Sequence, residues 1–208
     1  MKKVLLTIAA VAFATSLFAQ GTVVFNNRVL GSIVTKVYIG GNTQLVGNGP
    51  SDTPAGTFDW TGFTPISGSG FSAQLLGANG AGALESALQV APVVTTFRTG
   101  TAAGQVAGTT VTLVGVPENS PAATIMMVAW ENRGGEYPTW NEARPAWEAG
   151  LIAAGKSGPF TVNDIGGTQP APYLLNLKSF NIYLIPEPST FALAGLGAAA
   201  LMIFRRRK

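Results

Sequence analysis

Short runs in which apolar and polar residues alternate fill the middle of this chain. In one run Val111 and Leu113 alternate with threonines, and such a period of two places the apolar side chains on one face of a β-strand. Clusters of Gly, Pro, Asn and Ser, which are typical of turns, separate the runs. The pattern predicts about eight strands, at residues 22–26, 33–39, 71–76, 93–97, 110–114, 123–130, 160–163 and 179–184.

Repeated short strands without long helices between them are typical of a single all-β domain. Residues 123–130 are apolar at every position except Thr124, which predicts a central strand buried on both faces. We therefore predict one antiparallel β-sandwich, of the immunoglobulin-like or jelly-roll type. Ala, Glu and Leu at residues 145–154 predict one short helix, with Pro145 in the first turn, where its missing N–H costs little.

A long segment, residues 40–70, breaks the strand pattern. It is rich in Gly, Ser, Thr and Pro, yet it holds Phe58, Trp60 and Phe63. Flexible linkers seldom carry three aromatic side chains. We therefore predict a surface excursion that its aromatic residues pin to the domain.

The chain has no cysteine and no histidine. These absences exclude disulfide frameworks, thiol chemistry, histidine-containing catalytic triads and ordinary zinc sites. Residues 20–185 hold seven basic and nine acidic side chains, so the body has a net charge near −2 although the whole chain is formally +3. Because the basic excess lies at the two ends, we predict no nucleic-acid partner, and we also predict no metal and no cofactor.

A polar tripeptide, an apolar segment and a basic cluster end the chain, namely Pro186-Glu187-Pro188, residues 189–204, and Arg205, Arg206, Arg207 and Lys208. As a helix the apolar segment would measure about 24 Å, which is less than the ~30 Å hydrocarbon core, and arginines that reach the headgroups reduce the deficit. We predict a transmembrane helix whose terminal cations stay in the cytoplasm while the body lies outside. The prolines keep the tripeptide extended and outside that helix. An ordinary tail anchor with a chance Pro-Glu-Pro is the alternative.

The other end has the order of a secretory signal peptide. Two lysines precede an apolar run over residues 4–18, and small residues follow. We predict that the Sec translocon exports the chain and that signal peptidase cleaves it between Ala19 and Gln20. A first transmembrane helix is the alternative, which the short apolar run disfavours.

The tail, residues 186–208, resembles the PEP-CTERM sorting signal of exported bacterial proteins. The resemblance implies a transient stay in the inner membrane and processing by an exosortase-type enzyme, followed by release to the cell surface or extracellular matrix. The predicted organisation is a signal peptide (1–19), a β-sandwich domain (20–185) and a sorting tail (186–208). Short segments of the body also resemble small exported PEP-CTERM proteins, namely residues 21–28, 71–75, 96–100, 128–130 and 155–162. That likeness implies a β-rich exported domain and no assigned activity.

Aromatic and acidic residues gather between residues 130 and 164 and leave three interpretations open. A carbohydrate-binding module would present Tyr137, Trp140 and Trp147 to an exopolysaccharide. A glycoside hydrolase would need two carboxyl groups about 5–5.5 Å or 6.5–9.5 Å apart. Its candidates are Glu131, Glu136, Glu142, Glu148 and Asp164. The third interpretation is ordinary packing of the rings and solvation of the charges.

Exposure separates the first of these interpretations from the third, because exposed rings favour sugar binding and buried rings favour packing. We predict the third, a structural or interaction protein of the cell envelope or extracellular matrix that is not an enzyme.

Overall fold

The computed structural model describes residues 19–186 of the 208-residue chain. Most of the regular structure in this part is β-strand, and the predicted all-β, sandwich-like fold is confirmed. The strands are β1 (Gln20–Phe25), β2 (Arg28–Val29), β3 (Ile33–Val34), β4 (Val37–Ile39), β5 (Thr64–Pro65), β6 (Phe71–Asn79), β7 (Gln89–Thr96), β8 (Thr109–Pro117), β9 (Ala122–Glu131), β10 (Ala154–Lys156), β11 (Phe160–Asn163) and β12 (Phe180–Ile182). The helical elements are the α-helix α2 (Trp140–Glu148) and three 3₁₀ turns, η1 (Glu85–Ala87), η2 (Gly100–Ala102) and η3 (Arg133–Gly135).

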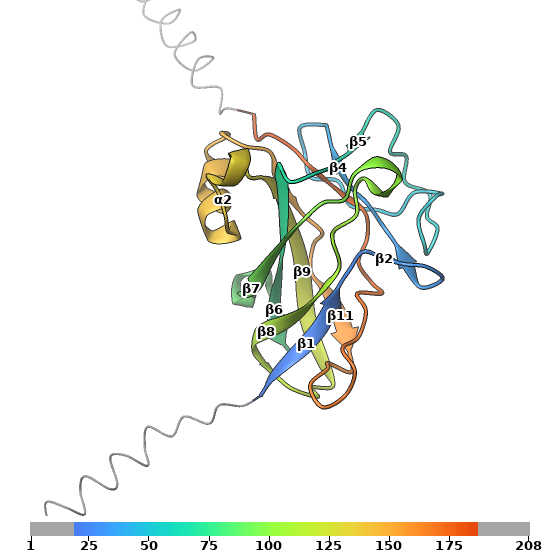
Figure 1. Ribbon diagram of the computed structural model, residues 1–208, viewed down its shortest axis with the longest axis vertical. Coiled ribbons are helices and arrows are strands. Elements are labelled where there is room, and N and C mark those ends of the chain that lie inside the picture. Colours follow the sequence, from blue (N-terminus) through green and yellow to red (C-terminus); the bar gives the residue numbers. More distant parts are fainter. Residues whose placement is uncertain (1–18, 187–208) are drawn as a thin grey trace, which may run out of the picture.

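The largest sheet has the strand order β10-β9-β6-β7, and β11 also pairs with β9. Strand β9 lies at its centre because β6 pairs along one edge and β10 and β11 pair along the other, all antiparallel. The antiparallel ribbon of β1 and β8 packs beside β6 and β7 (Figure 1). Buried side chains of both layers form the main core, which includes Phe25, Leu75, Val111, Leu113, Ile125 and Met127.

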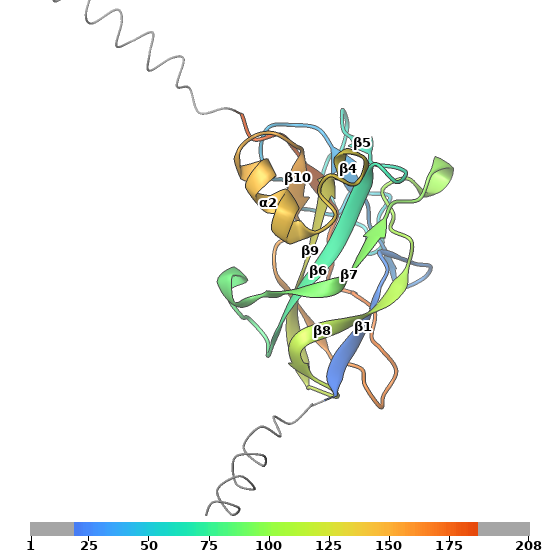
Figure 2. The same ribbon diagram turned by 60° about the vertical axis from the view of Figure 1, so that its left-hand side comes forward.

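Strand β9 contributes to two separate cores. Its eight positions 123–130 are all buried, as predicted for a central strand. Successive side chains of a strand point to opposite faces, so Ile125 and Met127 lie in the main core while Val128 and Trp130 lie in a second core under α2. The helix is therefore the cover for the outer face of the large sheet (Figure 2).

The helix begins five residues before its predicted start. The Glu142 carboxylate accepts hydrogen bonds from the Thr139 N–H at 2.9 Å and from the Thr139 hydroxyl at 2.7 Å, which fixes the first turn. Pro145 lies inside the helix and not at its start, at the cost of one intrahelical hydrogen bond. The prediction of a helix at residues 145–154 is thus wrong at both bounds, because the chain turns at Gly150 (φ 72°) and then enters β10.

The C-terminal strand differs from its prediction in two ways. Strand β12 pairs with β4 in parallel, so the sandwich is not purely antiparallel. Ser179 and Asn181, which the alternation places on a solvated face, are both fully buried. The predicted strand at residues 33–39 is likewise divided, since β3 pairs with β2 while β4 pairs with β5 and β12.

The two ends of the described chain lie at opposite ends of the domain (Figure 1). Within residues 19–186 no helix is long and apolar enough to cross a bilayer. The predicted signal helix and the predicted membrane helix at residues 189–204 lie outside the described residues. So do all the predicted tail residues except Pro186, including Glu187, Pro188, Arg205, Arg206, Arg207 and Lys208.

Candidate functional site

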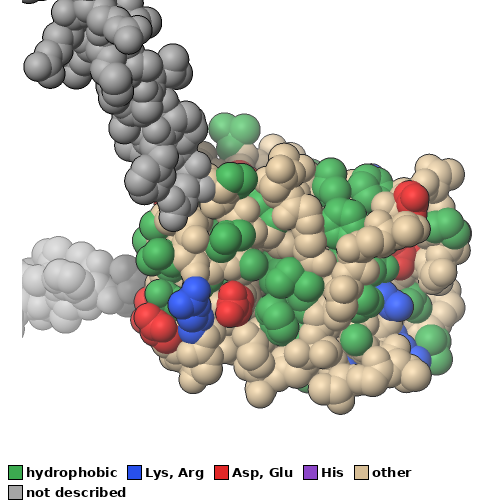
Figure 3. Space-filling model, turned by 90° about the horizontal axis from the view of Figure 1, so that it is seen from above, with side chains coloured by type: hydrophobic (Ala, Val, Ile, Leu, Met, Phe, Trp, Pro, Cys, Tyr) green, Lys and Arg blue, Asp and Glu red, His purple; other side chains and the backbone are tan. Residues whose placement is uncertain are grey.

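The tail leaves the domain next to α2 with almost no spacer. Tyr183 exchanges backbone hydrogen bonds with Ala154 of β10, and its carbonyl also accepts a hydrogen bond from the Trp147 Nε1–H at 3.0 Å. Only two residues then separate Tyr183 from Pro186, which is exposed. The end face from which the chain leaves carries apolar side chains among a small number of charged ones (Figure 3).

The predicted signal-peptidase junction lies at the opposite end of the domain. Ala19 and Gln20 are both exposed. The Ala19 carbonyl accepts a hydrogen bond from the Glu118 N–H at 2.8 Å, and Gln20 starts β1 opposite Pro117 of β8. The junction therefore lies on the surface, where the folded body begins.

Two of the three aromatic residues proposed to bind a glycan are buried. Trp140 is 3% exposed and Trp147 is 6% exposed, whereas Tyr137 is half-buried. Trp130, Trp140, Trp147 and Tyr183 form a chain of rings, the tryptophan cluster, whose neighbouring centroids lie 5.6–5.9 Å apart. The indole N–H of Trp130 donates to the Tyr137 carbonyl at 2.8 Å. Burial leaves no open face on the rings of Trp140 and Trp147, so the exposure criterion assigns these two residues to packing.

Three of the five acidic residues of the same region have local partners. Glu142 caps α2, as described above, and Glu148 pairs with Arg144 one turn earlier at 2.8 Å. Glu131 lies 4.0 Å from Arg133. Among residues 19–186 no group of three or more acidic side chains is placed to hold a metal ion. These contacts favour the structural interpretation for Glu131, Glu142 and Glu148.

A second group of rings, which we call the aromatic hollow, consists of Tyr38, Phe58, Trp60 and Phe63. Tyr38 extends from β4, and the other three belong to the excursion at residues 40–70. Trp60 is the centre of the group, because it stacks on Tyr38 at 4.5 Å and 11°, tilts against Phe58 at 4.6 Å and meets Phe63 edge-on at 5.3 Å. All four side chains are half-buried and line a depression of about 510 Å³. The excursion is thus pinned by aromatic residues, as its composition predicts.

Polar side chains complete the wall of the aromatic hollow, namely Lys36, Ser51, Asp52, Thr57, Asp59 and Thr61. Asp52 is 6% exposed, and its Oδ2 accepts hydrogen bonds from the Gly49 N–H at 2.7 Å and from the Ser179 hydroxyl at 2.8 Å. Burial, and secondarily the charge of Asp52, raise the pKa of Tyr38 to about 12. Hydrogen bonds from Thr61 lower the pKa of Asp59, which is therefore ionised at neutral pH.

A buried amide fastens the excursion to β12. The Asn181 Nδ2 donates to the carbonyls of Gly40 and Thr43 at 2.8 and 2.9 Å, and its Oδ1 accepts from the Leu45 N–H at 2.7 Å. These bonds join residues about 140 positions apart. They explain why Asn181 is buried although the alternation predicts exposure.

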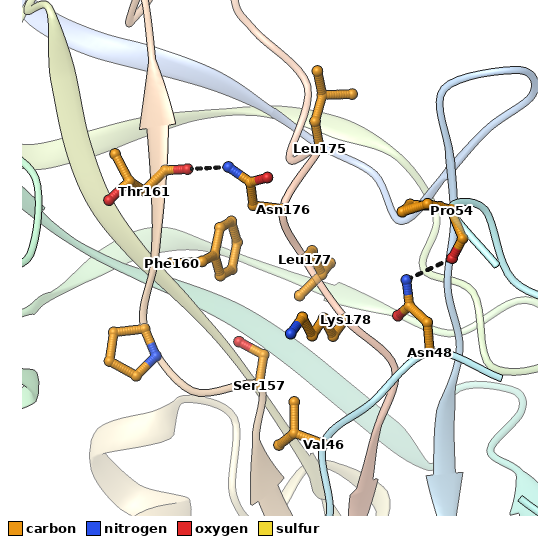
Figure 4. Close-up of a pocket in the computed structure, with 11 residues that line it drawn as sticks. Val46, Asn48, Pro54, Ser157, Phe160, Thr161, Leu175, Asn176, Leu177 and Lys178 are labelled. Carbon is orange, nitrogen blue, oxygen red and sulfur yellow. Dashed lines mark hydrogen bonds between the residues drawn. The ribbon is translucent and has the colours of Figure 1, made fainter. Parts of the chain in front are cut away.

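Another depression, of about 400 Å³, lies between β11, residues 175–178 and the loop around residue 48 (Figure 4). The side-chain amides of Asn176 and Asn48 in its wall already donate hydrogen bonds within the protein. The Asn176 side chain donates to the Thr161 carbonyl and the Asn48 side chain donates to the Pro54 carbonyl, both at 2.8 Å. The aromatic hollow has the larger volume and two carboxylates, so it is the stronger candidate for a ligand.

A family model of the PEP-CTERM protein-sorting motif matches residues 184–208. The chain carries a PEP-CTERM sorting motif. The match confirms the resemblance drawn from the Pro-Glu-Pro tripeptide and supports an exported protein that an exosortase sorts. It begins at Leu184, directly after the residue that Trp147 holds. No curated protein and no solved structure matches the chain.

The sequence alone does not predict that the residues of the aromatic hollow lie together. Three aromatic residues within six positions of a Gly-rich segment were a signal for Phe58, Trp60 and Phe63. Nothing in the sequence joined Tyr38, Asp52 or Ser179 to them. Tyr38 meets the excursion through the pairing of β4 with β5, and Asp52 meets Ser179 through a hydrogen bond that spans 127 positions.

Proposed function

We propose that this PEP-CTERM protein is a structural or interaction protein of the cell envelope or extracellular matrix, and that it is not an enzyme. The sorting motif at residues 184–208, joined without a spacer to a folded β-domain, is the observation that carries the proposal. The local partners of the acidic side chains near α2 support the absence of a catalytic role.

The proposed route begins with the Sec translocon and signal peptidase. Cleavage between Ala19 and Gln20 is compatible with the fold, because both residues are exposed and the core begins only at Val23. The mature chain would then start with the first residue of β1.

The second step is a stay in the inner membrane. Residues 189–204 would form the anchor, with the body outside and the cluster Arg205–Lys208 in the cytoplasm. An exosortase-type enzyme would then act at Pro186-Glu187-Pro188 and release the body to the surface or matrix. Because Pro186 follows the domain so closely, the body would lie against the membrane until release.

The test is to replace Pro186, Glu187 and Pro188 with alanine in the full chain and to express it in a host that has an exosortase. We expect the variant to insert into the membrane but to stay unprocessed, which mass spectrometry of the membrane and released fractions would report. The matched control changes Pro170 and Pro172, a second pair of prolines around one residue, to alanine.

The control should be processed as the natural chain is. Equal rates of tail removal in the tripeptide variant and in the natural chain would contradict the proposal. A second variant with Arg205–Lys208 made neutral should lose its orientation in a protease-protection assay, since the positive-inside bias would be gone.

A further inference from the structure

We infer that the aromatic hollow binds a neutral hexose polymer. The inference rests on the proposed function in one respect. The protein must be exported, because such a polymer would be met outside the cell. The depression has the volume of a ligand site, since its 510 Å³ lies within the ~300–1,000 Å³ of typical pockets.

The rings supply the apolar part of such a site. Sugar rings present C–H groups on one face, and these groups pack on the faces of aromatic side chains. Of the four tryptophans in the chain, all of which lie within residues 19–186, Trp130, Trp140 and Trp147 are buried and Trp60 alone is half-exposed. Trp60 is also fixed in place, because its indole N–H donates to the Gly47 carbonyl at 3.0 Å and one ring face stacks on Tyr38.

The polar groups supply acceptors and donors for hydroxyl groups. Asp52 and Asp59 offer carboxylate oxygens, and Ser51, Thr57 and Thr61 offer hydroxyls. A ligand rich in hydroxyl groups would satisfy this mixed lining better than an apolar ligand would.

The charges of the lining select against charged polymers. An anionic polysaccharide would face the two carboxylates of Asp52 and Asp59. The two carboxylates and the rings would attract a cationic ligand. Lys36, which lines the same hollow, would repel it. The lining thus fits a neutral chain of hexoses best.

The hollow is held in shape before any ligand arrives. Asp52 is locked by Gly49 and Ser179, and Asn181 ties residues 40–45 to β12. A site that is already ordered loses less conformational entropy when a ligand binds. The long excursion therefore works as a rigid wall.

The test uses fluorescence of the full chain, purified in detergent, with acrylamide as the quencher. Because only Trp60 is half-exposed, quenching should come mostly from it. Cellohexaose and laminarihexaose, two neutral glucan oligomers, serve as probes, while polygalacturonate and choline represent the anionic and cationic classes. We expect a neutral glucan to protect Trp60 from quenching, and the change W60A to weaken binding by about tenfold or more, as the loss of a buried aromatic contact predicts.

The matched control is Y173A, which removes an exposed ring outside the hollow and should leave affinity unchanged. If W60A fails to fold, protection of Trp60 in the natural chain still decides the question. No protection by either glucan would overturn the inference, as would protection by polygalacturonate or choline in their place. The result is independent of sorting, so the tripeptide variant and this titration can fail separately.

Discussion

The tryptophan cluster and the aromatic hollow contain the same kinds of residue but differ in what covers them. In the tryptophan cluster α2 carries Trp140 and Trp147 and packs them against the sheet with Trp130, which is fully buried. In the aromatic hollow Trp60 stays half-buried and lines the depression together with the carboxylates of Asp52 and Asp59. Aromatic content therefore does not reveal a binding surface. What decides whether rings are accessible is the element that packs with them. In the tryptophan cluster that element is α2, a helix of 9 residues.

Removal of the most deeply buried ring of the tryptophan cluster should have the largest effect. The change W130A deletes a fully buried indole and its hydrogen bond to the Tyr137 carbonyl. We expect the free energy of unfolding to fall by about 3–5 kcal/mol, as for other buried aromatic residues. Chemical denaturation would measure it, and a loss below about 1 kcal/mol would break the distinction between the two ring groups.

The next effect in size concerns the amide that holds the aromatic hollow to the sheet. The change N181A leaves the Leu45 N–H and the carbonyls of Gly40 and Thr43 without their partner. Since each unsatisfied buried group costs about 1–3 kcal/mol, we expect a loss of about 2–4 kcal/mol. Hydrogen exchange at the Leu45 amide should also accelerate. An unchanged exchange rate there would show that the excursion does not depend on Asn181.

A smaller loss of stability is expected for the half-exposed ring. The change W60A removes one indole hydrogen bond and part of the burial of Tyr38 and Phe58, so the free energy of unfolding should fall by about 1–2 kcal/mol. W60F, which keeps a ring, should recover part of it. Equal losses for W60A and W130A would mean that the hollow is a core of the same kind as the tryptophan cluster.

The smallest effect is a dependence of stability on alkaline pH. The pKa of Tyr38 is raised from its ordinary value of 10.0 to about 12 in the folded protein. A folded pKa above the unfolded one means that the folded state keeps its proton longer, so stability is full below pH 10 and declines as the pH rises toward 12. Ultraviolet titration of the phenolate would measure the pKa, and Y38F should flatten the decline. A Tyr38 that titrates near pH 10 would show that the hollow is more open to water than the structure indicates.

Much of the sheet followed from local pattern. Val111 and Leu113 are buried where alternation placed them, and 123–130 is the central strand. The prediction misplaces the helix because Pro145 is typical of a first helical turn, whereas the Thr139–Glu142 pair fixes the true start. Pro145 and the Thr139–Glu142 pair are both short-range signals for the start of a helix. The capping pair is the one that determines where α2 begins.

Burial of particular side chains could not be predicted in the same way. Ser179 and Asn181 alternate with apolar residues, so the pattern placed them in solvent. They are buried because residues 40–52 fold over them and satisfy their hydrogen bonds. The sequence leaves Trp140 and Trp147 open to either interpretation, and the packing of α2 on the sheet decides it.

The sequence by itself determined the sorting motif of this protein and the class of its fold. The sorting motif and the alternation along a strand depend on neighbouring residues, so both can be derived from a linear pattern. Tertiary structure alone decided which rings are covered and which line a hollow. That outcome depends on contacts such as the one between Gly40 and Asn181, which are 141 positions apart and are brought together only by the pairing of β4 with β12.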